Sequence, residues 1–156
     1  MKIQLALLMS LCFVFGAQAR LLNVLPYDAQ TDKADLVVVA TPTAVAETSE
    51  VVALPNIVTV YDDGRKEAVM GKGVETSFEV LSVLKGEPGP RTFVLHHFKR
   101  AKPETDFGDP MLVAFKPEEK KRYLMFLKKE ADGRYAAVCG QTDPAYSIKE
   151  LVDNFP

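Results

Sequence analysis

Cysteine is scarce in this sequence of 156 residues, which contains only Cys12 and Cys139. Cys12 lies inside an apolar N-terminal run, and Leu11 stands before it where a lipoprotein signal has a small residue. If that run is removed, the remaining chain has a single thiol and cannot form an intrachain disulfide. We expect Cys139 to be a buried, inert thiol, with pairing between two chains as the alternative.

The sequence has one long apolar run, at its N-terminus, and no second one. In the first one, Lys2 provides a positive charge, Ile3 to Phe15 form the apolar stretch, and Ala17-Gln18-Ala19 has the small-x-small pattern of a cleavage site. The stretch is shorter than the roughly 20 residues that span a bilayer. We therefore expect residues 1–19 to be a signal peptide cut after Ala19, and residues 20–156 to be one secreted or periplasmic domain without a transmembrane segment.

The chain has no excess of positive charge, because 19 Lys and Arg residues are balanced by 21 Asp and Glu residues. This balance gives no electrostatic basis for binding nucleic acid. Two basic clusters, Lys99 to Lys102 and Lys120 to Arg122, do have aromatic residues nearby, which single-stranded nucleic acid would need for stacking. Those aromatic residues are Phe93, Phe98, Tyr123 and Phe126. Since they stand at strand positions, core packing is the simpler interpretation, and we predict no nucleic-acid partner.

Catalytic and metal-binding motifs are absent as well: there is no Gly-x-Ser-x-Gly and no His-Glu-x-x-His. His96 and His97 are the only histidines, and neighbours on a strand point to opposite faces, so they cannot easily share one metal ion. Asp106-Phe107-Gly108 lacks the other kinase motifs and reads as a loop. Gly71-Lys72-Gly73 lacks the third glycine of a dinucleotide site and reads as a flexible lead-in to a strand. We predict no catalytic, cofactor-binding or metal-ligating residues and no cofactor.

The clearest strand signal is the stretch from Val74 to Leu84. Its even positions share one face if the segment is extended, and its odd positions begin polar and become apolar at Leu81 and Val83. β-Branched and aromatic residues favour a strand over a helix here. We expect Phe78 and Val80 to lie at the centre of the interior, and the late part of the strand to be buried on both faces.

Several other segments have the length and composition of strands. They are Leu36–Ala40 with its continuation Thr43–Val45, Ile57–Tyr61, Glu67–Met70, Arg91–Phe98, Tyr123–Leu127 and Tyr135–Cys139. Met111–Phe115 is a further short apolar run. Asp62-Asp63-Gly64 and Asp132-Gly133 are tight-turn signals. Pro42 has no amide donor, so the first strand should continue along an edge or over a bulge. Residues 47–72 are expected to form a hairpin arm or long loop that projects from the main sheet.

Helix is expected only near the two ends. Arg20 to Lys33 is predicted to be irregular, with one helical turn at Asp32 to Asp35. At the other end, Ser147 and Glu150 have capping-box spacing, and Ile148, Leu151 and Val152 would form the apolar side of a short helix. No helix of crossover length separates the strands, which argues against a parallel α/β sheet. The pattern predicts about six strands in a small barrel or sandwich.

Four segments follow one another within residues 34–141: Ala34–Thr41, Thr76–Gly86, Arg122–Leu127 and Asp132–Gly140. In the order of these segments the chain has a resemblance to the TIMP-like or netrin-like domains of secreted proteins. It implies an all-β fold, a small antiparallel Greek-key barrel that is OB-fold-like, with a short helix packed at one end. Family members that inhibit metalloproteinases have a cysteine at the mature N-terminus, whereas Arg20-Leu21-Leu22 stands here. The N-terminal residues with which those inhibitors bind their target therefore have no counterparts in this sequence.

These observations predict a non-enzymatic module that binds another protein or a component of the cell envelope. One alternative is an exported protease inhibitor that acts through another edge or loop, such as Glu47 to Lys72. A second alternative is a small metal-binding protein or hydrolase that uses His96 or His97. The sequence does not indicate an oligomeric state.

Overall fold

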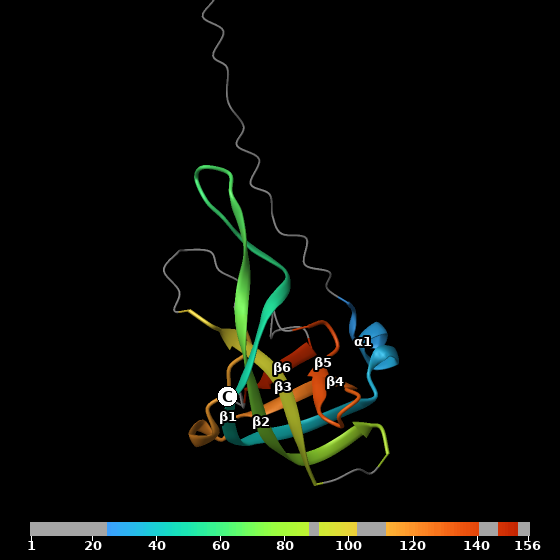
Figure 1. The fold of residues 1–156 in the computed structure, drawn as a ribbon. Coiled ribbons are helices and arrows are strands. Elements are labelled where there is room, and N and C mark those ends of the chain that lie inside the picture. Colours follow the sequence, from blue (N-terminus) through green and yellow to red (C-terminus); the bar gives the residue numbers. More distant parts are fainter. Residues whose placement is uncertain (1–24, 88–90, 103–111, 141–146, 153–156) are drawn as a thin grey trace, which may run out of the picture.

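The computed structural model describes residues 25–87, 91–102, 112–140 and 147–152, so the expected leader and Asp106-Phe107-Gly108 lie outside the described residues (Figure 1). Its elements in chain order are α1 (Tyr27–Lys33), β1 (Leu36–Val60), β2 (Lys66–Lys85), β3 (Thr92–Arg100), the 3-10 turn η1 (Pro117–Glu119), β4 (Arg122–Lys129), β5 (Tyr135–Ala137) and β6 (Ile148–Leu151).

Five strands close into a ring in the order β1-β2-β3-β5-β4, because β4 also pairs with β1. The pairs are antiparallel except β3 with β5, which meet in parallel at Leu95 and Tyr135. This order gives the Greek-key connectivity of an OB-type barrel. The predicted all-β, small barrel is confirmed, with one parallel contact in an otherwise antiparallel ring.

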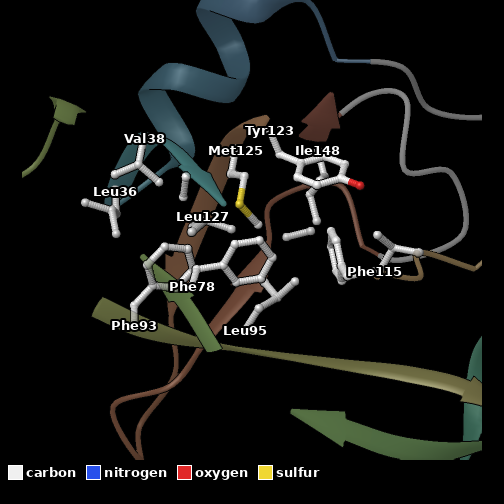
Figure 2. Close-up of a cluster of buried hydrophobic side chains, with 13 residues drawn as sticks. Leu36, Val38, Phe78, Phe93, Leu95, Phe115, Tyr123, Met125, Leu127 and Ile148 are labelled. Carbon is white, nitrogen blue, oxygen red and sulfur yellow. The ribbon is translucent and has the colours of Figure 1, made fainter. Parts of the chain in front are cut away.

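The barrel interior is filled by side chains from every strand of the ring, with Phe78 at its centre (Figure 2). Phe78 is fully buried, stacks on Phe93 with ring centroids 5.2 Å apart, and meets Phe115 edge-on at 5.0 Å. Val80 is partly buried against the same cluster. The expectation that the interior centres on these two β2 residues is confirmed for Phe78 and holds in part for Val80.

A hairpin arm made of the distal halves of β1 and β2 extends well beyond the barrel (Figure 1). β1 pairs with β4 only as far as Ala40, and its register against β2 shifts between Pro42 and Ala44, as expected for a proline without an amide donor. The two strands stay paired out to Val60 and Lys66, where Gly64, at φ 81°, completes the turn. The hairpin predicted for residues 47–72 is therefore confirmed.

The C-terminal helix predicted from Ser147 is wrong, because residues Ile148–Leu151 form β6 and pair with Arg122–Met125 of β4. β5 is short and covers β4 only from Leu127 to Lys129, so the start of β4 has a free edge for β6 to fill. The Ser147 hydroxyl does not cap a helix that follows it, since it accepts a hydrogen bond from the backbone amide of Cys139 at 2.8 Å.

Two further expectations need correction. The late part of the Val74–Leu84 segment is not buried on both faces: Leu81 and Leu84 are 50% and 62% exposed, because β3 pairs with β2 only as far as Glu79. At the N-terminal side, a full helix, α1, stands where an irregular segment was expected. The Lys85 ammonium donates to the carbonyl of Thr31 near its C-terminus, and Tyr27 stacks on Phe126.

The position of Phe78 generates a stability prediction. Replacing Phe78 with alanine should lower the free energy of unfolding by about 3–5 kcal/mol, since the change removes a large buried ring from a closed barrel. Urea unfolding at neutral pH measures this loss, and Phe78→Leu, which fills more of the space, should lose less. A loss below about 1 kcal/mol for the alanine variant would show that Phe78 does not organise the core.

Candidate functional site

The two histidines lie on opposite faces of β3, as the sequence predicted. β2 and β3 are in regular register, so His97 shares the barrel interior with Thr76, while His96 is on the outer face beside Glu75. A single metal ion cannot bridge the two rings in this arrangement. Among the described residues, no group of three or more His, Cys, Asp or Glu side chains is arranged to hold a metal ion.

His97 is a structural residue of the barrel interior. Its Nε2 lies 2.8 Å from the Thr76 hydroxyl, and its ring meets Phe115 edge-on at 5.3 Å. Burial, which penalises the charged form, lowers the pKa of His97 to about 4 from its ordinary value of 6.5. The ring is therefore neutral at neutral pH, and it is held by aromatic packing and by its contact with the Thr76 hydroxyl.

His96 is the centre of a polar site, which we call the His96 site, formed with Glu50 and Glu130. Its Nε2 lies 3.0 Å from Glu50 Oε2, and its Nδ1 lies 2.9 Å from Glu130 Oε2. Glu50 belongs to the hairpin arm, and Glu130 to the turn that joins β4 to β5. One buried ring on the barrel wall thus contacts two carboxylates from two separate segments.

A bulge in β1 aims Glu50 at this ring. Glu47 pairs with Val74 and Val51 pairs with Lys72, so three β1 residues, 48 to 50, stand opposite Gly73 alone. Bulges of this kind redirect side chains out of the regular alternation. A Cβ at position 73 would overlap the Thr48 hydroxyl and press on Glu50 at 3.1 Å, so only glycine lets the bulge lie against β2.

Gly71 has a similar role, which corrects the prediction that Gly71-Lys72-Gly73 is a flexible lead-in. The segment is a paired part of β2, and a Cβ at position 71 would lie 2.5 Å from Leu54 Cδ2. Leu54 belongs to a small buried cluster with Ile57 and Val69, against which Phe98 also packs. These two glycines allow the arm to pack closely on the outer face of the sheet.

Further charges surround the His96 site. Arg134 donates to Glu75 at 2.9 Å and to Asp132 at 2.8 Å, and its Nε lies 3.9 Å from Glu130 Oε2. The hydrogen bonds from Arg134 lower the pKa of Asp132, and the bond to Asp132 is the main reason why the pKa of Arg134 is raised. The β4–β5 turn is therefore an ordered neighbour of the site.

The inner face of the arm carries a second charged group, at the mouth of the barrel. Glu47 accepts hydrogen bonds from Lys72, at 2.7 Å, and from Lys99. These two bonds lower the pKa of the Glu47 carboxyl to about 2. Lys121 is likewise paired, with Glu119 and Glu150, while Phe93, Tyr123 and Phe126 are buried. These three aromatic residues serve core packing, as interpreted from the sequence, while Phe98 is partly buried and packs on the outer cluster of Leu54, Ile57 and Val69.

Beyond Lys72, the same face of the arm is apolar and open to solvent. Met70 and Lys72 lie on the same face of β2 as its core residues, because alternate residues of a strand share a face. This face of the arm, which we call the open face, therefore continues the inner face of the barrel beyond the barrel itself. Its large side chains are Val51, Val58, Val60 and Met70, which are 54%, 44%, 61% and 41% exposed. Cys139, expected to be buried, is a free thiol of intermediate exposure.

Sequence reasoning missed Glu50, Glu130 and Arg134 as members of one site. The Asp132-Gly133 turn was visible, but nothing in the sequence showed that it would return to His96.

Among the described residues, no helix has the length and apolar character needed to cross a bilayer. Comparison with known proteins found no matching family model, no matching curated protein and no matching solved structure.

The low pKa of His97 predicts how stability depends on pH. As the pH falls below 6.5 the unfolded chain binds a proton before the folded chain does, so stability is lost between pH 6.5 and about 4. Between about pH 7.5 and about pH 5 this loss should be roughly 2 kcal/mol. Urea unfolding at the two pH values measures it. In His97→Gln, which keeps the other titrating groups, the pH dependence should shrink by that amount, and an undiminished dependence would contradict the assignment.

Proposed function

We propose that this protein is an exported protein-binding module of the TIMP-like or netrin-like type, and that the open face of the hairpin arm is its binding surface. Two independent features support the proposal. The N-terminal pattern of Lys2, Ile3–Phe15 and Ala17–Ala19 supports export. The order of strands in the ring is compatible with the resemblance to that family, whose fold is an OB-type barrel.

The observation that carries the proposal is the exposure of the arm's open face. Four large apolar side chains, Val51, Val58, Val60 and Met70, share one face of a two-stranded ladder and are each more than two-fifths exposed. A two-stranded hairpin is marginally stable in water, and here the other face of the arm carries Leu54, Ile57 and Val69, which already pack with Phe98. Exposed apolar patches of this kind mark interaction sites.

The edge of β1 favours a protein over a lipid bilayer as the partner. In the part of the chain that the structure describes, no strand pairs with β1 past Ala40 on the side away from β2. An extended segment of another protein can add to such an edge and satisfy its backbone groups. A bilayer interior cannot satisfy them, which makes insertion of this edge costly.

The charges beside the open face indicate the chemistry of the partner. Lys66 pairs with Val60 at the tip, and Lys72 pairs with Val51 at the base, next to Lys99. Glu47 neutralises part of this positive charge. The surface therefore suits an extended, apolar segment that carries acidic residues at its ends.

The geometry gives less support to a hydrolase. A catalytic histidine needs one ring nitrogen that can reach a substrate or nucleophile, yet both nitrogens of His96 contact carboxylates. His97 is buried among core residues. The alternative of a protease inhibitor is a narrower form of the proposal, in which the protein bound by the arm is a protease.

The test compares two matched double variants. Val58→Asp with Val60→Asp charges the open face, and Leu81→Asp with Leu84→Asp charges the exposed apolar end of β2, which lies on the barrel and outside the arm. Each immobilised protein is incubated with envelope extract, and a photo-crosslinking residue at position 70 identifies what contacts the arm. We expect wild type and the Leu81/Leu84 variant to retain the same crosslinked protein, and the Val58/Val60 variant to lose it at least about tenfold.

Equal retention by all three proteins would overturn the proposal. Crosslinks between two copies of this chain would instead assign the arm to self-association. Flotation of the protein with lipid vesicles, lost only in the Val58/Val60 variant, would assign it to a membrane surface. Assays of proteases with the purified domain separate inhibition from simple binding.

A further inference from the structure

We propose that His96 is a pH-dependent clamp, which fixes the hairpin arm against the barrel when its ring is protonated and loosens the arm when the ring is neutral. The inference concerns the free protein and does not depend on the proposed binding function. It starts from the position of the ring between Glu50 on the arm and Glu130 on the barrel.

The hydrogen-bonding chemistry of the ring makes the bridge sensitive to protonation. A neutral imidazole has one N–H donor and one acceptor nitrogen, and an ionised carboxylate only accepts. Both contacts, 3.0 Å to Glu50 and 2.9 Å to Glu130, can therefore be hydrogen bonds at once only when both ring nitrogens carry a proton. In the neutral ring, one nitrogen lone pair faces a carboxylate oxygen, and that contact changes from attractive to repulsive.

In the described part of the chain, the charges near the ring come from the arm, from β2 and from the β4–β5 turn. The arm contributes Glu50, β2 contributes Glu75, and the β4–β5 turn contributes Glu130, Asp132 and Arg134. The neighbouring His97 lies on the inner face, where burial keeps it neutral above about pH 4. Among the residues that the structure describes, four carboxylates and one guanidinium thus lie near His96, and a proton on the ring adds attraction to this set.

The bulge places the clamp where it can control the arm. Glu50 is the last residue of the three that stand opposite Gly73, at the base of the arm, and the rest of the arm extends from the next residue, Val51, to its tip. A second brace lies on the opposite face of the arm from the Glu50–His96 contact. There, the ion pairs of Glu47 with Lys72 and Lys99 hold the base of the arm. That brace does not titrate near neutral pH, since the pKa of Glu47 is about 2. Loss of the His96 proton therefore weakens the contact with Glu50 and leaves intact both the Glu47 brace and the packing of Leu54 with Phe98.

The clamp is closed when both ring nitrogens of His96 carry a proton and open when only one does, so acidification should close it and a rise in pH should open it. This is the opposite direction to the effect of His97, which lowers global stability as the pH falls. The two effects are separable because one acts on the arm alone and the other on unfolding of the whole barrel.

The experiment is amide hydrogen exchange of the full domain at about pH 5.5 and about pH 8, with protection factors corrected for the intrinsic exchange rate. Arm amides of residues 51–60 and 66–70 should be about tenfold better protected at the lower pH in wild type. Nitrogen NMR of the His96 ring should show both nitrogens protonated at the lower pH, and the change in arm protection should follow that titration.

Two variants and one control decide the outcome. His96→Gln removes the titrating group, and Glu50→Gln replaces the arm carboxylate with an amide that can donate or accept, so both should abolish the pH dependence of arm protection. Glu47→Gln, which weakens the other brace, should lower protection by the same factor at both pH values. Arm protection in wild type that is the same at both pH values, or that keeps its pH dependence in either variant, would overturn the proposal, as would a singly protonated ring at the lower pH.

Discussion

The shared ladder of β1 and β2 is the constraint on which the rest of this structure depends. The two strands have 25 and 20 residues, which is longer than a small barrel needs, and they remain paired from Val37–Lys85 to Val60–Lys66. Their proximal parts help to close the ring around Phe78, so the distal parts must leave the barrel as an arm. One face of that arm continues the line of the core and is left open to solvent.

The irregularities of the ladder are what give the arm its geometry. An uninterrupted ladder would keep Glu50 in the regular alternation, whereas the bulge opposite Gly73 turns it toward His96. A second shift, in which residues 54 to 57 stand opposite Val69, directs Leu54 and Ile57 into the outer cluster. The arm is thus packed on one face, charged at its base and apolar along the other face, and this combination supports the proposed binding role.

The parts of the fold that were predictable are those that local pattern decides. Alternation located Phe78, and the Asp62–Gly64 and Asp132–Gly133 turns fixed two hairpins, because both signals act over a few residues. β6 was mistaken for a helix because the burial of Ile148 depends on the free edge of β4, which is distant in sequence. The His96 site was invisible for the same reason: its contacts join residues 46 and 34 positions apart. Leu84 is exposed because the pairing of β2 with β3 stops at Glu79, and the composition of the segment does not show where that pairing stops.

The central claim is that the barrel is the folding unit and the arm is its binding element. It is tested most directly by replacing residues 52–71 with an Asn-Gly turn between Val51 and Lys72, which are partners in the ladder. The account predicts that the shortened protein unfolds in one cooperative transition with its Phe78 core intact, and that it no longer retains the protein captured by the full chain. A shortened protein that fails to fold, or that folds and still retains that protein, would contradict the account.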